Sequence, residues 1–457
     1  MTNSIVKFHK RPFVQTVFLA LLLPLGAIPS AAQRAVPRDP PEPRPQPKNL
    51  VRPAGGIARA SVDEKSMRAL IGKLVACGTR LTLSSWADPK RGIGCGRDAI
   101  AARFHEIAKD SNGKLQVVVD KFESTSERTS SKPIPLENVY AILPGSDPKM
   151  AKTIFIVSGH FDSRPSDVMD PKADAPGADD DASGVAVSAE CARLLSKAGA
   201  NGRGTYRATI LFAAVSGEEQ GLLGATRLLE WAKQQGYTVG GMLDDDIVGA
   251  DPAPVAPHRV RLFSGNGEID DCDSPSRELA RAVEEIDGRA AIRMIFRIDR
   301  YGRGGDHYPF YKAGLPAVRF TEPLEDYNHQ HQTPRTENGI EYGDFEKYLN
   351  FAFMGDVARD NAEALRQLAL APAPPATYAS EEETLVADNE VGNFTLLPGS
   401  LPQDVDDSAI VRVGMQRGAL SALGLPVNEE RVSDWIQVDL LVGQDGLPKA
   451  VRLPQSQ

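Results

Sequence analysis

The feature that most constrains the fold is a regular alternation of apolar strand patterns with helical patterns. Residues 152–162 (KTIFIVSGHFD) and 207–219 (RATILFAAVSGEE) carry continuous apolar and β-branched runs, which are typical of strands buried on both faces of a sheet. Helical patterns follow them at 183–199 and 222–236. This alternation predicts an α/β fold, a three-layer αβα sandwich in which helices cover both faces of a mixed central sheet.

The same alternation continues on both sides of these two units. A capping box, Ser61 with Glu64, predicts a helix that runs to about Ala76. A long helix at 344–369 is expected to close the fold. Further strands are predicted at 114–123, 138–145, 259–265, 291–298 and 315–322.

Composition divides the 457 residues into five parts. Enrichment in Pro and Arg before Ser61, and in Pro, Ala and acidic residues after Leu370, marks two linkers that cannot bury enough apolar surface to fold. Beyond the second linker, the alternating stretch WIQVDLLV, a Gln444-Asp445-Gly446 turn and LPKAVRLP predict a hairpin. The expected parts are a signal peptide (1–32), a linker (33–60), the main domain (61–370), a second linker (371–383) and a small C-terminal β-containing segment (384–457).

The first 32 residues have the pattern of a secretory signal peptide. Lys7, Lys10 and Arg11 precede the apolar stretch TVFLALLLPLGAI, and the small residues SAA stand before Gln33. This stretch is shorter than the ~20 residues that a spanning helix needs, so export to the periplasm or beyond is favoured over a membrane anchor. No later stretch is long and apolar enough to span a bilayer.

The charge of the chain argues against nucleic acid as a partner. The formal net charge is −9, and no basic block lies in the interior of the sequence. Nucleic-acid binding needs a cationic face. Nothing in the sequence indicates the oligomeric state.

The four cysteines do not form a disulfide scaffold or a CxxC metal motif. In an oxidising compartment Cys77 and Cys95 could pair across a short loop region, and the sequence leaves this open. Cys191 lies on the apolar side of a predicted helix, where a buried thiol is expected.

Polar groups stand where the predicted strands end, which is where open α/β sheets build their sites. His160 and Asp162 follow the first buried strand. His-x-Asp alone is more often an ordinary surface loop, but a metal-bound imidazole usually donates its other N–H to a carboxylate. Asp162 suits that role.

Three consecutive aspartates, Asp179, Asp180 and Asp181, precede the helical pattern at 183–199. One Asp would suffice to cap a helix, and the spacing of a calcium loop is missing. No Lys or Arg lies between Ala175 and Ala192 to compensate three carboxylates. The charge of the three aspartates is therefore expected to be compensated by a cation from elsewhere, such as a metal ion.

More acids and histidines follow at later strand ends. Glu218 and Glu219 follow the second buried strand, and Asp244, Asp245 and Asp246 precede a predicted short buried strand at 247–249. Asp306 and His307 lie in a Gly-rich loop, and His329 and His331 lie in the polar loop EDYNHQHQTP. Acidic residues that enter the interior need a cation or hydrogen-bond donors.

Nitrogen and carboxylate ligands without thiolates suit zinc, with manganese or cobalt as possible replacements. The carboxylates are too many for one structural zinc. A two-metal site bridged by one carboxylate and one water fits better.

In their order along the chain, the segments SGHFDS, PGADDDASGVA, SGEEQGLLGA, DDDIVG and NHQHQTP resemble the dizinc exopeptidases of metallopeptidase family 28. Secreted bacterial leucine aminopeptidases and aminopeptidase Y typify that family. The resemblance covers roughly residues 61–370 and implies a zinc-exopeptidase fold with two Zn²⁺.

Carried over residue by residue, the resemblance implies that His160 and Asp246 hold one metal and that Glu219 and His331 hold the other. Asp180 would bridge the two, and the bond after it is typically cis in the family. All five ligand positions carry suitable residues. That argues against the related transferrin-receptor ectodomain, which is not catalytic, and against the one-zinc glutaminyl cyclases.

The implied chemistry is hydrolysis of peptides from the N-terminus, with Glu218 as general base and Asp162 orienting the histidine ligand. Asp306, His307 and Tyr301 are candidates for substrate contacts. Alternatives on the same site are carboxypeptidase, dipeptidase or aminoacyl-hydrolase activity. An alternative of another class is a non-catalytic metal-binding protein of the cell envelope.

Overall fold

The structure is a computed structural model, in which the chain divides into two units, Met1–Pro43 and Arg44–Gln457. All of the described residues belong to the second unit. They are 56–197, 206–251, 259–264, 274–287, 293–297, 304–375, 394–397, 409–416, 420, 435–442 and 448–452.

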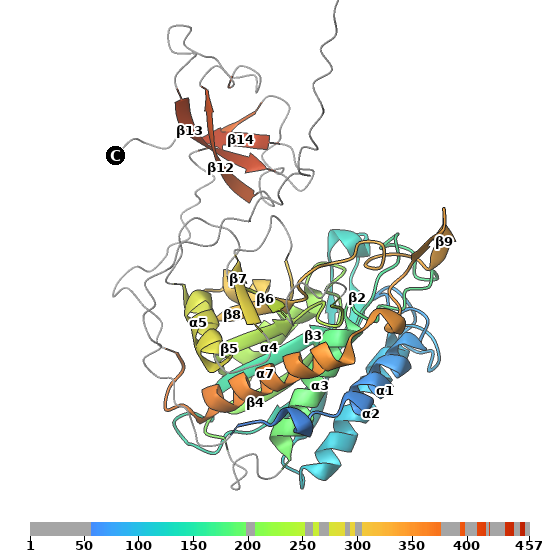
Figure 1. Cartoon of the computed structure of the whole chain (residues 1–457), viewed down its shortest axis with the longest axis vertical. Coiled ribbons are helices and arrows are strands. Elements are labelled where there is room, and N and C mark those ends of the chain that lie inside the picture. Colours follow the sequence, from blue (N-terminus) through green and yellow to red (C-terminus); the bar gives the residue numbers. More distant parts are fainter. Residues whose placement is uncertain are drawn as a thin grey trace, which may run out of the picture. The chain divides into compact units, whose positions relative to one another are not determined.

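Helices and strands alternate through the main domain as the sequence predicts (Figure 1). The α-helices are α1 (Glu64–Val75), α2 (Ile93–Asp110), α3 (Ala182–Ser196), α4 (Leu223–Gln234), α5 (Pro275–Asp287), α6 (Tyr308–Lys312) and α7 (Phe351–Leu370). Short 3₁₀ turns are η1 (Arg59–Ser61), η2 (Glu127–Thr129) and η3 (Glu346–Tyr348). The strands of the main domain are β1 (Gln116–Ser124), β2 (Ile134–Leu143), β3 (Thr153–His160), β4 (Thr209–Val215), β5 (Thr238–Asp245), β6 (Arg259–Phe263), β7 (Arg293–Arg297), β8 (Ala317–Thr321), β9 (Arg335–Glu337) and β10 (Ile340–Tyr342).

The central sheet is mixed and has eight strands in the order β1-β2-β4-β3-β5-β8-β6-β7. Its middle strands β4, β3, β5 and β8 are all parallel, and β1 and β2 add antiparallel strands at one side. On the other side β6 runs antiparallel to β8 and parallel to β7. The carboxyl ends of β3, β4, β5 and β8 therefore meet at one edge of the sheet.

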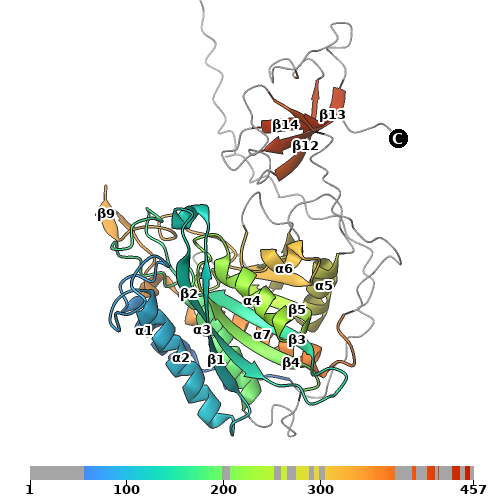
Figure 2. The same ribbon diagram turned by 180° about the vertical axis from the view of Figure 1, so that it is seen from behind.

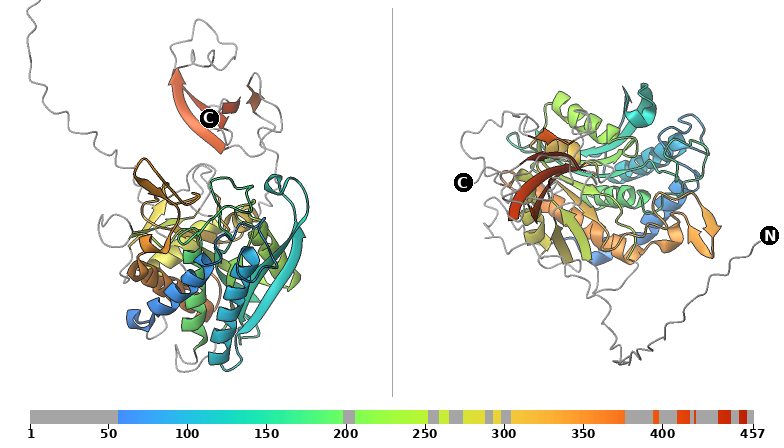
Figure 3. Two further views of the ribbon diagram at one scale, coloured as in Figure 1. Left: turned by 90° about the vertical axis from the view of Figure 1, so that its right-hand side faces the viewer. Right: turned by 90° about the horizontal axis from the view of Figure 1, so that it is seen from above.

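The sheet buries apolar side chains on both faces, as the continuous apolar strands predict. On β3, Phe155 and Val157 face the larger core with α1, α2, α3, α5 and α7. Ile154 and Ile156 of the same strand face the second core with α4 and α6. Figure 2 shows α4 and α6 on the face opposite to α7, and Figure 3 shows α1 alongside α2. The three-layer prediction is confirmed.

Three local predictions are wrong. The N-cap of α1 is Asp63, whose side chain accepts the Ser66 N–H at 3.0 Å, while Ser61 lies in η1. The closing helix α7 begins only at Phe351, because the Asn350 side chain caps it by accepting the Phe353 N–H.

The third error concerns the acidic stretch before residue 247. Asp244 and Asp245 end strand β5, and no strand begins at 247–249. Ile247 has a φ of 64°, which interrupts extended backbone. Helix α2 was not predicted at all.

The C-terminal segment contains a four-stranded antiparallel sheet in the order β11-β14-β13-β12. Its strands are β11 (Thr395–Leu396), β12 (Ala409–Gln416), β13 (Trp435–Val442) and β14 (Pro448–Arg452). The predicted hairpin is confirmed as β13 paired with β14, and its predicted turn lies outside the described residues. Among the described residues, no helix is both long and apolar enough to cross a membrane.

Cys77 and Cys95 form a disulfide across 18 positions of sequence, which settles the pairing that the sequence left open. Cys191 is a buried free thiol, as expected.

We expect Cys95→Ser to lower the free energy of unfolding by about 3 kcal/mol, because the unfolded chain loses a cross-link over a loop of this length. Urea unfolding of the two proteins measures the difference. Equal stabilities would contradict this role for the disulfide.

Candidate metal centre

The candidate site lies at the carboxyl ends of the parallel strands, at the point where two successive crossover connections lead to opposite sides of β3. From β3 the chain passes to β4 on one side, and from β4 it crosses over β3 to β5 on the other side. Such a switch point leaves a crevice at the carboxyl ends of the strands, where open α/β sheets bind ligands. His160 is the last residue of β3, and Asp246 directly follows β5.

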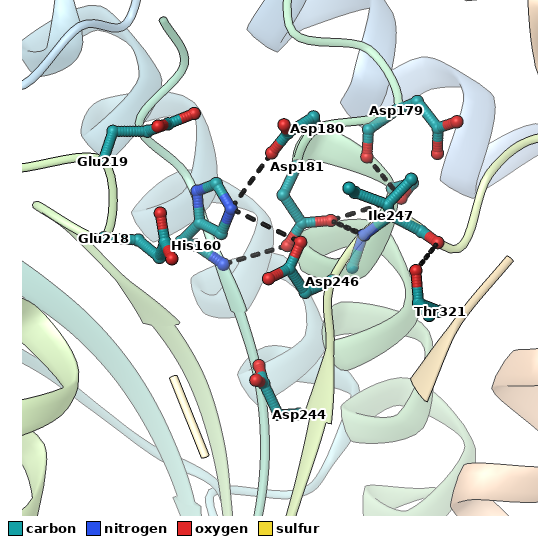
Figure 4. Close-up of polar contacts among 12 residues, drawn as sticks. His160, Asp179, Asp180, Asp181, Glu218, Glu219, Asp244, Asp246, Ile247 and Thr321 are labelled. Carbon is teal, nitrogen blue, oxygen red and sulfur yellow. Dashed lines mark hydrogen bonds and ion pairs between the residues drawn. The ribbon is translucent and has the colours of Figure 1, made fainter. Parts of the chain in front are cut away.

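Two groups of side chains converge there and share one member. His160, Asp180 and Asp246 form the first group, and Asp180, Glu219 and His331 form the second. Within each group the possible ligand atoms all lie within 4.8 Å of one another. Figure 4 shows the His160 ring with dashed contacts to Asp180 and Asp246 on one side, and with Glu218 and Glu219 on its other side.

Asp180 turns one oxygen toward each group. Its Oδ1 lies 3.2 Å from His160 Nε2, and its Oδ2 lies 2.9 Å from His331 Nε2. His160 Nε2 is 3.8 Å from Asp246 Oδ1, and His331 Nε2 is 3.2 Å from Glu219 Oε1. Two atoms that bind one zinc ion tetrahedrally at ~2.0–2.1 Å lie about 3.3 Å apart, so these spacings fit two metal positions on either side of Asp180.

Two of these oxygens test whether the site suits a metal ion by a criterion other than the distances between ligand atoms. Asp180 Oδ2 and Glu219 Oε1 are buried and lie 2.9 and 3.2 Å from the same nitrogen, His331 Nε2, and among the described residues neither oxygen accepts a hydrogen bond of good geometry. A buried oxygen without a donor is costly. Imidazole nitrogens and carboxylate oxygens are zinc ligands, so the donor set fits the group that the sequence predicts.

The carboxylate of Asp181 fastens three elements together behind the bridge. It caps α3 by accepting the Gly184 N–H at 2.9 Å, and it also accepts the N–H groups of His160 at 3.0 Å and Ile247 at 3.3 Å. The ends of β3 and β5 and the start of α3 are thus tied to one side chain. The peptide bond between Asp180 and Asp181 is cis, as the resemblance implies.

Arg80 supplies the positive charge that the sequence around the triplet lacks. Its guanidinium is fully buried and donates to the main-chain oxygens of Phe161, Pro176 and Gly177, each at 2.7 Å. Burial lowers the pKa of Arg80 to about 10, and nearby carboxylates, Asp344 first, partly offset this. Arg80 stays charged at neutral pH and holds the loop before Asp180 against the end of β3.

Asp344 holds the same loop from the other side. Its two oxygens accept the N–H groups of Asp179, at 2.9 and 3.0 Å, and of Asp180, at 2.8 Å. Burial, followed by the charge of Asp179, raises the pKa of Asp344 to about 8. Asp179 itself points away from the bridge and accepts the Gly249 N–H at 2.7 Å. Burial raises the pKa of Asp179 to about 6 against a hydrogen bond with Glu322.

Asp162 organises the turn after β4 as well as His160. Its Oδ2 accepts the Glu219 N–H at 3.1 Å and the Thr82 hydroxyl at 2.9 Å, and its Oδ1 lies 3.3 Å from the Glu218 nitrogen. The His160 Nδ1 is 3.1 Å from the main-chain oxygen of Asp162 and 3.6 Å from its carboxylate. The main-chain contact to the imidazole was not expected.

Glu218 is largely buried beside the two groups, with part of its side chain exposed, and its pKa is raised well above the usual value. Burial is the main cause, and the carboxylates of Glu219, Asp246 and Asp162 act in the same direction against His160. A carboxylate with a raised pKa is a stronger base than an ordinary one.

The surrounding carboxylates raise the pKa values of the two histidines. Burial would lower the pKa of His331, but Glu219 and Asp180 raise it to about 10. Burial opposes protonation of His160 too, but its contacts with Asp162, Asp180 and Asp246 raise its pKa well above the usual range. A divalent ion would replace these protons as the partner of the carboxylates.

Asp246 has a second partner beside the candidate metal position. Arg319 Nη2 lies 3.1 Å from its Oδ2, while Oδ1 faces His160. Burial would raise the pKa of Asp246, but Arg319 and His160 lower it below the usual value. A charged residue inside the strand PAVRFT, which the apolar pattern predicts to be buried, was the available signal for Arg319.

The structure places two of the three residues that were predicted to contact substrate, and their surroundings differ. Asp306 is fully buried, and neither of its side-chain oxygens has a hydrogen-bond partner among the described residues. His307 is also buried, and its main-chain N–H and its Nδ1 lie 3.0 and 3.1 Å from Asp244 Oδ2. Tyr301 lies outside the described residues. His329 stacks on Tyr348 and belongs to neither group of candidate ligands.

Neither Arg80 nor Asp344 could be identified as part of the site from the sequence, for different reasons. Arg80 stands alone in the stretch VACGTRLTL, where one charge among apolar and small residues was the only signal. Asp344 is 164 positions from Asp180 and lies in no motif, so only the tertiary fold brings it to the triplet.

Comparison with known proteins agrees with this geometry. The model of Peptidase family M28 matches residues 138–352, which include every candidate ligand. A probable zinc metalloprotease from Leptosphaeria maculans is 40% identical over 372 residues, covering 75% of this chain and 83% of the relative. This chain belongs to peptidase family M28. A second probable zinc metalloprotease, from Pyrenophora tritici-repentis, is 40% identical over 362 residues and covers 73% of this chain and 72% of the relative.

Solved structures share the fold of this M28 chain at low sequence identity. The LapA aminopeptidase of Legionella pneumophila superimposes with a TM-score of 0.52 at 16% identity, over 68% of this chain and 71% of that one. LapB from the same organism gives 0.51 at 18% identity, over 68% and 74%. At these identities the likeness shows the fold alone.

The central position of Asp180 predicts different effects for two neighbouring aspartates. Asp180→Ala should abolish metal binding at both positions, because each oxygen of the carboxylate faces one group. Asp179→Asn should retain both ions, because an amide oxygen can still accept the Gly249 N–H. Metal analysis of the purified variants after dialysis measures the stoichiometry. The opposite ranking of the two variants would contradict the shared-carboxylate geometry.

Metal binding should release protons and weaken as the pH falls. The pKa of His331 is raised to about 10, so at pH 7 its imidazole holds a proton that a metal must displace, and the pKa of His160 is raised as well. Titration calorimetry with Zn²⁺ in buffers of different ionisation enthalpy measures the number released. We expect release of at least one proton per chain at pH 7, with affinity rising toward pH 9. Affinity independent of pH would contradict these protonation states.

Proposed function

We propose that this chain is an exported, zinc-dependent aminopeptidase that removes residues from the N-terminus of peptides. The observation that carries the proposal is the pair of ligand groups that share Asp180, with Glu218 beside them. The names of the M28 relatives, probable zinc metalloproteases, support zinc as the metal. The name of LapA, an aminopeptidase of the same fold, is consistent with the activity.

The five ligand positions receive the roles that the motifs imply. His160 and Asp246 would hold one Zn²⁺, Glu219 and His331 the other, and Asp180 would contribute to both. Bound there, two zinc ions supply positive charge that polarises the scissile carbonyl and favours deprotonation of water. Mn²⁺ or Co²⁺ can occupy the same kind of nitrogen and oxygen site.

The protein residues then handle the proton. Glu218 accepts a proton from the attacking water and returns it to the leaving amine, for which its raised pKa suits it. Asp162 fixes the backbone of Glu218 and Glu219 through their N–H groups, so the base and a metal ligand move as one turn.

The choice of the N-terminus rests on Asp306. Its oxygens are buried and accept no hydrogen bond from the described residues, and its pKa is raised well above the usual value by burial and by Asp244, Glu218 and Asp246. A substrate α-ammonium group would both neutralise and hydrogen-bond such a carboxylate. We assign that role to Asp306, whereas His307 is held by Asp244 behind it.

Export is the part of the proposal that the N-terminal segment supports. The positive residues, the apolar stretch and the small residues before Gln33 form a signal-peptide pattern. The Cys77–Cys95 disulfide suits an oxidising compartment. N-terminal sequencing of the mature protein from the periplasm or the medium would find the new terminus near Gln33, and an unprocessed N-terminus would contradict export.

Glu218→Gln should separate catalysis from metal binding. We expect turnover of leucine p-nitroanilide to fall about 10²–10⁴-fold while two zinc ions remain bound, because the variant loses only the proton acceptor. Glu106→Gln on the outer face of α2 is the matched control and should keep full activity.

The same assay tests the direction of cleavage. N-acetylation of a peptide substrate should abolish cleavage, whereas an amidated C-terminus should still be tolerated. Cleavage of N-acetylated peptides would favour a carboxypeptidase instead. A zinc-loaded protein that cleaves none of them, or a protein that binds calcium and no transition metal, would contradict the proposal.

A further inference from the structure

The charges around the two ligand groups are unequally distributed, and this distribution gives the site a direction. Beside His160 and Asp246 lie two further buried carboxylates: Asp244, which contacts His307, and Asp306, which has no hydrogen-bond partner among the described residues, while Arg319 is paired with Asp246 itself. Beside Glu219 and His331 the wall is basic, since Arg164 and Arg128 both contact Glu219.

The basic side is also the open side. The side chain of His331 is 36% exposed and that of Arg164 is 20% exposed, whereas His160 is 1% exposed. A peptide whose ammonium group is held at Asp306 would extend its leaving part toward this more exposed side, where Arg164 lies.

Arg164 has unused capacity to bind an anion. Its Nη1 lies 3.4 Å from Glu219 Oε2, which is long for a charge-assisted hydrogen bond. Its Nε is buried and has no hydrogen-bond partner among the described residues. A small rotation of the side chain, which is 20% exposed, would let two N–H groups of this guanidinium donate to one carboxylate, in the bidentate geometry that arginine favours.

The neighbouring contacts keep Arg164 in place. Ser166 and Thr333 exchange hydrogen bonds of 3.2 and 3.0 Å, which join the segment after Arg164 to the loop that carries His331. Gln220 donates to the Val168 main-chain oxygen at 3.3 Å. The segment that carries Arg164 is therefore held against the loop of His331, and the Arg164 side chain contacts Glu219 beside one candidate metal position.

We propose that Arg164 binds the C-terminal carboxylate of the leaving residue, so that the preferred substrates are dipeptides with a free carboxylate. This inference rests on the proposed aminopeptidase function. In a dipeptide the carboxylate lies about one residue, ~3.8 Å, beyond the scissile carbonyl, and each added residue moves it outward by as much. Arg164 contacts Glu219, a candidate ligand of one metal position, so only one side chain separates it from that metal position. This closeness suits the carboxylate of a dipeptide better than that of a longer peptide.

The test compares leucyl-alanine with leucyl-alanine amide, which differ only in the carboxylate. We expect kcat/KM of the wild-type protein to favour the free acid by about tenfold or more, the range for a hydrogen bond to a charged group. Arg164→Gln should bring the ratio close to one, and Arg164→Lys should retain part of it. Because the ratio compares two substrates on one preparation, a change in zinc content cancels.

The matched control is Arg103→Gln on α2, which removes the same charge away from the site and should leave the ratio unchanged. A second readout is calorimetric binding of both peptides to the inactive Glu218→Gln protein, where the free acid should bind about tenfold more tightly.

The outcomes separate the two claims. Equal cleavage of acid and amide by the wild-type protein, or a ratio unchanged in Arg164→Gln, would overturn the role of Arg164 and leave the aminopeptidase function standing. Cleavage of neither peptide, nor of leucine p-nitroanilide, would contradict the proposed function. The binding comparison would then decide the role of Arg164, and equal binding of the two peptides would overturn it.

Discussion

The interaction on which the rest of the site depends is the repulsion among carboxylates buried at the ends of β3, β4 and β5. Asp180, Asp181, Glu219 and Asp246 are each at most 5% exposed. Charges buried together are unfavourable unless cations and donors surround them. The described structure supplies part of that compensation: Arg80 behind the triplet, Arg319 beside Asp246, and main-chain N–H groups on Asp181. The oxygens that face the two candidate metal positions are the ones that still need a cation.

The fold makes this crowding possible through close contact of backbones. A Cβ on Gly184 would lie 2.0 Å from the Asp245 main-chain oxygen, and one on Gly159 would lie 2.5 Å from the Gly184 carbonyl carbon. Only glycine lets the start of α3 approach the ends of β3 and β5 so closely. That approach lets Asp181 cap α3 and fasten both strands, and it places Asp180 between the two ligand groups.

Much of the fold and the position of the site could be predicted from local sequence patterns, whereas the assignment of ligands to two metal positions came from the family resemblance. Continuous apolar strands predict the layers, and polar residues directly after them predict the site edge. The errors lie where a side chain elsewhere decides a boundary, as when Asp63 rather than Ser61 caps α1, or where one backbone angle ends a strand, as at Ile247. The partners Arg80 and Asp344 could not be predicted, because distant segments bring them to the triplet. The helix-cap and metal interpretations of the triplet are both needed: Asp181 is the cap, and Asp180 is the candidate bridge.

The most direct test of the account is to locate the metals themselves. Crystals of the zinc-loaded protein, with anomalous diffraction recorded on both sides of the zinc edge, would show how many ions bind and which residues hold them. The account predicts two zinc peaks about 3.5–4 Å apart with one Asp180 oxygen on each. A single zinc peak, or two ions without Asp180 between them, would contradict it.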